Sequence, residues 1–178
     1  FILKCDVKKF FASINHNKLF SVLSQYISDS DILWLLQKIV NSFHSTEQGV
    51  GLPLGNLTSQ LLVNIYMNEF DQFVKHQLKV KHYIRYADDF VIFSENKEKL
   101  EEILPKISKF LESKLHLQLH PNKVLIRRLH SGIDFLGWVH FLDHRVLRTT
   151  TKRRMLKKLK ANPKLEIVQS YLGLLGHG

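Results

Sequence analysis

The sequence contains a single cysteine, Cys5, among its 178 residues. One thiol cannot form an internal disulfide, so the chain suits a reducing compartment. The position of Cys5 in the apolar segment 1–7 predicts a buried thiol rather than a nucleophile. The sequence also lacks any run of 18 apolar residues and any signal-peptide pattern, so it supports neither a membrane span nor secretion. We therefore expect a cytoplasmic protein with no membrane partner.

Acidic residues are also scarce, because 16 Asp and Glu face 26 Lys and Arg. The resulting net charge of +10 and pI of about 9.7 favour a polyanionic partner such as nucleic acid, although a basic surface that only serves solubility is the alternative. With 44% hydrophobic residues, a chain of this length can bury the core of one ordinary domain with a small appendage.

Two adjacent carboxylates, Asp88 and Asp89, follow Tyr86 and Ala87 between two apolar segments, 82–85 and 90–93. Both segments are rich in β-branched and aromatic residues, which predicts two strands that meet at a tight turn. Two carboxylates at such a turn repel each other and stay ionised only if a cation or solvent compensates them. The pair therefore indicates a divalent metal, and a solvated Asp-Asp turn is the alternative.

A third carboxylate, Asp6, lies near the end of the predicted strand 1–7. A carboxylate on one strand that faces a carboxylate pair on a neighbouring hairpin makes a site of hard oxygen ligands. Magnesium prefers such ligands when substrate phosphates complete its coordination. The pattern therefore suits phosphoryl transfer assisted by two metal ions.

The remaining segments alternate between helical and extended patterns. Helical spacing covers 18–25 and 31–43, the latter with an N-cap at Ser30 or Asp31. A loop at 45–56 precedes a further helix, and Asn96 or Ser94 caps another that contains Pro105. The expected buried stripes are Leu33, Leu36, Ile39 and Val40; Leu57, Leu61, Leu62, Ile65, Phe70, Phe73 and Val74; and Leu100, Ile103, Leu104, Ile107 and Leu111. Short strands are expected at 117–119, 124–129 and 135–141, before a basic helix from Thr149 that ends near 162–163.

This order of elements predicts an α+β fold, in which an antiparallel sheet has helices on one face and the three carboxylates on the other. The change in composition near residue 149 predicts two domains, residues 1–148 and 149–178.

Four motifs in this order, Asp6, the loop 51–56, the turn 86–89 and the segment 135–138, make the sequence resemble the palm of a reverse transcriptase. The resemblance covers nearly the whole chain and implies RNA-templated DNA polymerisation. It is closest to the bacterial enzymes of diversity-generating retroelements, because Ser59 and Gln60 stand where intron and retron relatives more often have Ser-Pro. Residues 149–178 then resemble the beginning of a basic helical thumb, and the fingers that usually precede the first catalytic Asp are missing, which leaves open whether this segment alone is active.

The resemblance also implies roles for individual residues. Asp6 and Asp88, with the Val7 carbonyl and Asp89 beside them, would bind two Mg²⁺ ions, for which Mn²⁺ could substitute. Four residues would bind the incoming nucleotide: Phe11 beneath its sugar, Leu54 and Gly55 in the glycine-containing loop, and Lys123 near its triphosphate. The nucleic-acid-binding residues would be Gly137, Trp138, Lys152, Arg153, Arg154, Lys157 and Lys158. Ordinary structural roles are the alternative for Phe11, Lys123 and Trp138, which would then be a core ring, a solvated lysine and a core ring. The loop 51–55 would likewise be an ordinary loop before a helix, and the basic helix after residue 149 would present a solvated charged face.

The implied partners are an RNA template, a DNA or RNA primer, deoxynucleoside triphosphates and a small accessory protein. Two other functions remain open at this point. The first is a reverse-transcriptase-like module kept for nucleic-acid binding or phage defence, against which the three intact carboxylates argue. The second is another palm-type nucleotidyl enzyme such as a nucleotide cyclase, which has no need of Phe11, the loop 51–55 or the basic helix.

Overall fold

The computed structural model describes residues 1–45 and 47–176. The chain divides into two compact units, Phe1–Ile126 and Arg127–Gly178, and each is described by itself. The predicted domain boundary lies later, near residue 149, at the start of a helix of the second unit. The assignment of 1–148 to a palm and 149–178 to a thumb stays a prediction.

A four-stranded sheet forms the centre of the first unit. Its strands are β1 (Ile2–Asp6), β2 (His82–Tyr86), β3 (Asp89–Phe93) and β4 (Leu125–Arg127), in the order β2-β3-β1-β4. Strand β3 pairs antiparallel with both β2 and β1. The predicted first strand and the predicted hairpin are confirmed, because their alternating β-branched and aromatic residues fit the pleat of a sheet.

The two faces of this sheet differ in chemistry because successive side chains on a strand point to opposite sides. Leu3 and Cys5 of β1 belong to the main hydrophobic core, as do Phe90 and Ile92 of β3. Burial raises the pKa of the Cys5 thiol to about 12, as expected for a core residue rather than a nucleophile. The alternate positions of β1 and β3 place Lys4, Asp6 and Asp89 on the opposite face.

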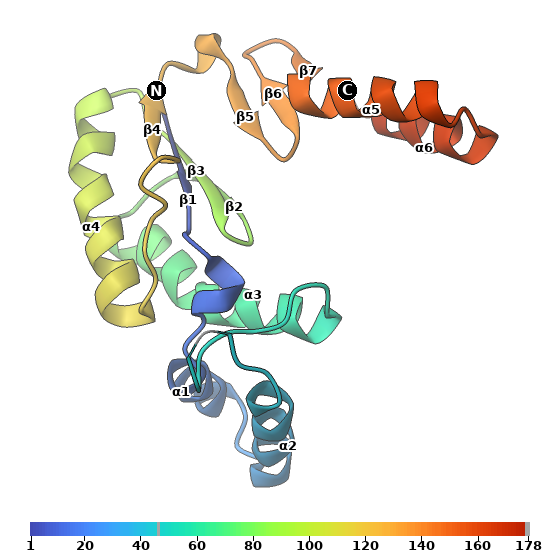
Figure 1. Cartoon of the computed structure of the whole chain (residues 1–178). Helices are drawn as coiled ribbons and strands as arrows, with labels where there is room; N and C mark the ends of the chain where they lie inside the picture. Colours follow the sequence, from blue (N-terminus) through green and yellow to red (C-terminus); the bar gives the residue numbers. More distant parts are fainter. Residues whose placement is uncertain (46, 177–178) are drawn as a thin grey trace. The chain divides into compact units, whose positions relative to one another are not determined.

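Helices α3 (Leu57–Gln72) and α4 (Lys97–Leu115) cover the core face, and the short η2 (Phe73–Gln77) extends α3 (Figure 1). The α+β fold with helices on one face of an antiparallel sheet is therefore confirmed. In α4 the predicted stripe is correct, since Leu100, Ile103, Ile107 and Leu111 are buried and Leu104 is half-buried. In α3 it is wrong at Leu57 and Leu61, which are exposed, because this helix turns Val63, Tyr66 and Met67 inward instead.

A short helical turn, η1 (Phe10–Ser13), links β1 to the helices α1 (His16–Tyr26) and α2 (Ser30–Asn41). The Asn15 side chain caps α1. Helix α2 begins one residue earlier than predicted, because the Asp29 carboxylate accepts hydrogen bonds from the backbone of Asp31 and Ile32 and so acts as the N-cap. Ser30 and Asp31 are therefore not the cap.

The predicted buried stripe of α2 is only partly correct. Val40 is buried, Leu33 and Leu36 are half-buried, and Ile39 is 41% exposed. Trp34 and Leu35 on the same helix are exposed as well. The spacing identified a helix but not its packing, because a periodic pattern does not reveal how much of the apolar face meets another element.

Two further predictions in the first unit need correction. Residues 117–119 do not form a strand within the described chain; instead Leu119 makes an isolated antiparallel bridge to Val7. The Lys8 amide donates to the Gln118 carbonyl, and the His120 amide donates to the Asp6 carbonyl. Pro105 was expected to kink this helix or to mark a late start; the late start is wrong, because α4 begins at Lys97 and runs through the proline.

The second unit contains a three-stranded antiparallel sheet and two helices. The strands β5 (Ile133–Phe135), β6 (Trp138–His140) and β7 (Arg145–Leu147) follow a short turn, η3 (Leu129–Ser131), and precede α5 (Thr149–Ala161) and α6 (Leu165–Leu175). The predicted strand 135–141 is thus a hairpin, because a turn interrupts it at Leu136 and Gly137. The basic helix is confirmed, whereas β7 and α6 were not predicted. Among the described residues, no helix is long and apolar enough to cross a membrane.

Candidate active site

The turn between β2 and β3 brings the three carboxylates together. Asp6 at the end of β1 lies directly opposite Asp89 at the start of β3, and Asp89 also pairs with Tyr86 across the hairpin. Asp88 occupies the turn itself, after Ala87, whose φ of 52° is in the left-handed region. The Val7 amide donates a 3.2 Å hydrogen bond to the Asp88 carbonyl and so ties the turn to the end of β1.

The surroundings of Asp88 and Asp89 disfavour the ionised forms of their carboxyl groups. Burial is the largest cause that raises the pKa of Asp88 above its ordinary value, and repulsion from Asp6 and Asp89 adds to it. Burial likewise raises the pKa of Asp89, where the Lys4 ammonium partly opposes it and repulsion from Asp6 adds to it. Like charges placed directly opposite on neighbouring strands are destabilising. The group therefore favours a compensating cation.

Two lysines provide part of this compensation. The Lys123 ammonium lies 2.9 Å from the Oδ2 atom of Asp6, whose side chain is only 11% exposed. The Lys4 ammonium lies 3.5 Å from the Oδ1 atom of Asp89. The Lys123 side chain is therefore paired with Asp6 and is also 54% exposed, so the structure does not decide between its predicted role and the solvated alternative. Its predicted role near a triphosphate stays a prediction.

The chemistry of these side chains fits a hard divalent cation. Within the described residues, Asp89 Oδ1 is a buried side-chain oxygen that lies 3.5 Å from the Lys4 ammonium without a closer hydrogen-bond donor, so it retains lone pairs for a ligand. No three His, Cys, Asp or Glu side chains of residues 1–45 and 47–176 form a group that could hold a metal by itself. A magnesium ion bound by one or two of these carboxylates would need substrate phosphates and water as its remaining ligands.

The predicted glycine-containing loop is connected to Phe11. The Leu52 amide donates to the Phe11 carbonyl at 2.8 Å, and Phe11 is half-buried against the core, edge-on to the buried ring of Phe10. A side chain at Gly51 would place its Cβ 2.7 Å from the Cβ of Ser45, and its φ is 106°, so only glycine fits there. Phe11 as a sugar-contacting residue stays a prediction.

The two other residues of this loop are more open. Leu54 is 78% exposed, and a Cβ added at Gly55 would meet no atom within 4 Å, so the φ of 89° is what requires glycine at that position. Both residues lie just before Asn56, which is the N-cap of α3. The described contacts do not bring either of them to the three carboxylates, so their predicted part in nucleotide binding is untested.

The remaining predicted residues lie in the second unit. Leu136 and Gly137 both have positive φ, at 53° and 88°, which gives the two-residue turn of a tight β5–β6 hairpin. The Arg145 guanidinium lies 5.3 Å from the centre of the half-buried Trp138 ring. On α5, Lys152, Arg153, Arg154, Lys157 and Lys158 are all exposed, whereas Met155 is buried. Binding of nucleic acid by these residues stays a prediction.

Sequence reasoning missed three positions that build the site. Lys4 was detectable, because it lies two residues before Asp6 and therefore on the same face of β1. The buried His16 places Nε2 2.7 Å from the Gly51 carbonyl oxygen and Nδ1 3.2 Å from the Asn41 side chain, which holds the loop in place. Arg85, beneath the hairpin turn, pairs with Asp71 of α3. No local spacing signals the contacts of His16 and Arg85, because the fold alone brings these residues together.

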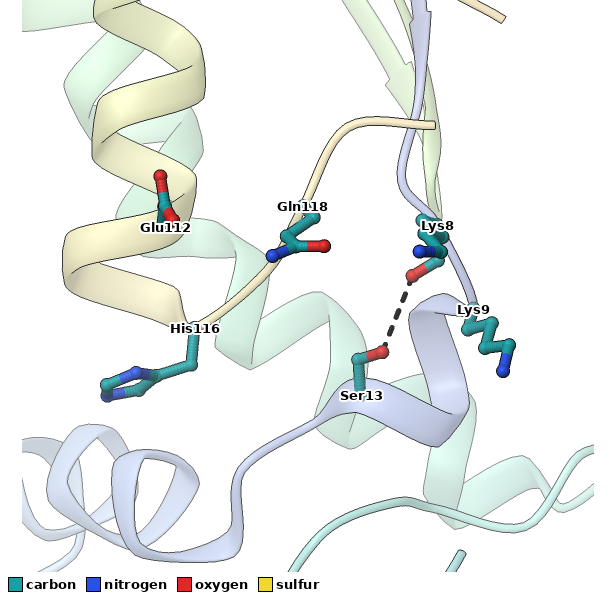
Figure 2. Close-up of a pocket in the computed structure, with 6 residues that line it drawn as sticks. All are labelled: Lys8, Lys9, Ser13, Glu112, His116 and Gln118. Atoms are coloured by element: carbon teal, nitrogen blue, oxygen red, sulfur yellow. Dashed lines mark hydrogen bonds between the residues drawn. The ribbon is translucent and has the colours of Figure 1, made fainter. Parts of the chain in front are cut away.

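A separate polar cavity of about 380 Å³ opens beside the end of β1. Its lining is Lys8, Lys9, Ser13, Glu112, His116 and Gln118 (Figure 2). The Ser13 hydroxyl donates a long hydrogen bond of 3.4 Å to the Lys8 carbonyl across it. None of the predicted site residues lines this cavity. It is therefore not the carboxylate site, although Lys8 and Lys9 add positive charge close to Asp6.

The sequence model of the family described as "Reverse transcriptase (RNA-dependent DNA polymerase)" matches residues 1–140, which include all three carboxylates. The chain belongs to the reverse transcriptase family. Protein YkfC of Escherichia coli (strain K12) is 26% identical over an alignment that covers 91% of this chain and 51% of YkfC. The group II intron-encoded protein LtrA of Lactococcus lactis subsp. cremoris is 26% identical over an alignment that covers 92% of this chain and 38% of LtrA.

Solved structures support the same fold for this reverse transcriptase chain. The foamy viral protease-reverse transcriptase in complex with an RNA/DNA hybrid superposes with a TM-score of 0.57 at 22% identity, covering 97% of this chain and 20% of the viral protein. The chain thus spans about half the length of YkfC and less of LtrA. The predicted diversity-generating subtype is not confirmed, and the relatives found include intron-encoded proteins.

Proposed function

We propose that the full-length protein polymerises DNA on an RNA template, by transferring nucleotides from deoxynucleoside triphosphates to a primer 3′-hydroxyl. The observation that carries this proposal is the convergence of Asp6, Asp88 and Asp89 at the end of β1 and the hairpin turn. Burial and mutual repulsion raise the pKa of Asp88 and Asp89. A family member that served only for binding would not need three carboxylates in such an unfavourable arrangement.

In this proposal Asp6 and Asp88, with the Val7 carbonyl, would hold two magnesium ions, and Asp89 would lie beside them. When bound, such ions supply positive charge that stabilises the attacking and leaving oxygens of an in-line displacement. Val7 and the β1 ladder keep the Asp6 and Asp88 main chains in register. Lys123 forms an ion pair with Asp6 in this structure and would donate a proton to the leaving pyrophosphate during the reaction.

The same proposal assigns the substrates to neighbouring surfaces. Phe11, Leu54 and Gly55 would contact the incoming deoxynucleotide, with the Phe11 ring against its sugar. An RNA template and a DNA or RNA primer would bind Gly137, Trp138 and the exposed cations of α5. The net charge of +10 supports a phosphate-rich partner, and the foamy viral relative is described in complex with an RNA/DNA hybrid. We further propose a bacterial, cytoplasmic protein of a retroelement that works with a small accessory protein.

Primer extension by the full-length protein tests this function. We expect Mg²⁺-dependent and template-dependent incorporation of deoxynucleotides on an RNA template annealed to a DNA primer. The comparison uses a DNA template of the same sequence and a reaction without template. Incorporation on the DNA template alone would contradict RNA-templated synthesis, and a reaction that yields only cyclic or untemplated products would point to another palm-type nucleotidyl enzyme.

A further inference from the structure

Both peptide groups that flank Asp88 are held by hydrogen bonds from outside the turn. On its amino side, the Ala87 carbonyl accepts a 3.1 Å hydrogen bond from Nη1 of Arg85. On its carboxyl side, the Asp88 carbonyl accepts a 3.2 Å hydrogen bond from the Val7 amide. Because two fixed peptide planes determine where the Cα–Cβ bond between them points, these contacts orient the Asp88 side chain.

Arg85 can hold the turn because it is itself fixed to helix α3. Its Nε and Nη2 atoms donate to the two carboxylate oxygens of Asp71 at 2.8 and 2.6 Å, which is a bidentate pair. The Tyr83 hydroxyl donates to Asp71 as well, at 2.7 Å. Nη1 also donates to the Asn64 side chain at 3.3 Å. With its side chain only 9% exposed, Arg85 has little freedom to move away from the turn.

The charges of this group support a permanent connection. Burial by itself lowers the pKa of Arg85, but the hydrogen bond and the negative charge of Asp71 more than offset it and keep that pKa above the ordinary value. Burial, followed by the charge of Asp71, raises the pKa of Tyr83, so its hydroxyl remains a donor. The guanidinium is therefore charged, and Tyr83 is protonated, at any pH at which the protein would work.

We propose that Arg85, clamped by Asp71, is a positioning residue that sets the orientation of the Asp88 carboxylate toward the metal ions. The inference rests on the proposed function, since it takes Asp88 as a metal ligand. This Arg85–Asp71 pair, which we call the clamp, connects helix α3 to the turn. Its side chains face away from the carboxylates, so it acts through the backbone and touches no substrate. A lysine at position 85 could replace the charge of Arg85 but not its bidentate contact with Asp71, which leaves Nη1 available to donate to the Ala87 carbonyl.

Mn²⁺ binding to the full-length protein, followed by electron paramagnetic resonance without nucleotide, tests the clamp. We expect Arg85→Lys to weaken Mn²⁺ binding by about 10- to 100-fold, the usual effect of losing a partner that orients a metal ligand. Asp71→Asn, which keeps the shape but loses the charge, should weaken it in the same direction. Ile107→Val on α4 is the matched control, because it perturbs the buried core at a residue that takes no part in the Arg85–Asp71 and Arg85–Ala87 hydrogen bonds.

The melting temperature of each variant separates positioning from stability. The clamp is supported if Arg85→Lys binds Mn²⁺ more weakly than Ile107→Val at an equal melting temperature. It is overturned if folded Arg85→Lys binds Mn²⁺ within twofold of the wild type. If Arg85→Lys does not fold, unchanged Mn²⁺ binding by Asp71→Asn overturns it instead.

The outcomes for the clamp and for the function can be told apart. A wild type that binds Mn²⁺ but does not extend primers contradicts the proposed function, and the clamp is still decided by the Mn²⁺ affinities. A wild type that extends primers while Arg85→Lys binds Mn²⁺ normally contradicts only the clamp. A wild type that binds no Mn²⁺ contradicts the metal site and the clamp with it.

Discussion

Replacing Lys123 by Gln should strengthen divalent-metal binding while it weakens the metal-free fold. The Lys123 ammonium and a metal ion compete for the same oxygens of Asp6, because the ammonium lies 2.9 Å from Oδ2. The hydrogen bond to Asp6 raises the pKa of Lys123, so the lysine remains charged at neutral pH and the competition persists there.

The exposures of the two partners set the size of the effect. Lys123 is 54% exposed and Asp6 11% exposed, so solvent screens the pair and it contributes about 1 kcal/mol, the upper end for surface ion pairs. Without a metal, the variant should therefore melt about 2–4 °C lower than the wild type. In the variant, Mn²⁺ no longer has to displace this ion pair, so the same free energy makes Mn²⁺ binding about fivefold tighter.

Mn²⁺ titration of the full-length proteins without nucleotide measures this competition, and thermal unfolding with and without Mn²⁺ gives an independent value. Lys97→Gln is the matched control, because Lys97 also pairs with a carboxylate, Glu101 at 2.7 Å, but on the exposed surface of α4. Equal or weaker Mn²⁺ binding by Lys123→Gln would refute the competition, and so would an equal gain in the Lys97→Gln control.

Three further predictions concern the charge, the sugar contact and the nucleic-acid surface. Because folding raises the pKa of Asp89, the stability that this group contributes is complete below its ordinary pKa of 3.8 and is lost as the pH rises through the folded-state pKa. Metal-free Asp89→Asn should therefore be more stable than the wild type at pH 7 but no more stable near pH 3.5. Urea titrations measure this difference, and a gain in stability that does not vary with pH would contradict the prediction. In single-nucleotide incorporation, Phe11→Val should accept ribonucleotides with little loss of deoxynucleotide use. Truncating a core Phe can cost roughly 3–5 kcal/mol of folding stability, so a variant that simply unfolds would indicate that Phe11 has a packing role. Neutralising Lys157 and Lys158 together should reduce the log–log salt dependence of template–primer binding by about 2, since each phosphate contact adds roughly 0.9, and an unchanged slope would mean that this side of α5 does not touch phosphates.

The sequence was sufficient to predict the sheet that carries the site. Strand β1 and the β2–β3 hairpin combine β-branched and aromatic residues with a sharp turn, so local preference and tertiary structure agree there. The same agreement predicted that Asp6 faces the carboxylate pair. The α4 stripe was predictable for the same reason, because its periodicity corresponds to one continuous buried face.

The errors occur where the fold, rather than local sequence, decides. The spacing of Ile39, Leu57 and Leu61 is helical, but these residues are exposed, since burial depends on which other elements are near. Asp29, rather than Ser30 or Asp31, caps α2, because one carboxylate can reach two amides. The pairs Lys123–Asp6 and Arg85–Asp71 join residues 117 and 14 positions apart, so no local rule could have found them.

The most direct test of the central claim is single-turnover deoxynucleotide incorporation by full-length Asp88→Asn on an RNA template with saturating Mg²⁺. Asparagine keeps the size of the side chain but removes the charge that binds the metal, so the rate should fall on the order of a thousandfold, equivalent to about 4 kcal/mol of lost transition-state stabilisation. The melting temperature of the metal-free variant should not fall, since the repulsion at the turn decreases. Glu98→Gln, an exposed carboxylate at the start of α4, should polymerise normally. Near-normal incorporation by folded Asp88→Asn would contradict the assignment of Asp6, Asp88 and Asp89 as the catalytic metal site.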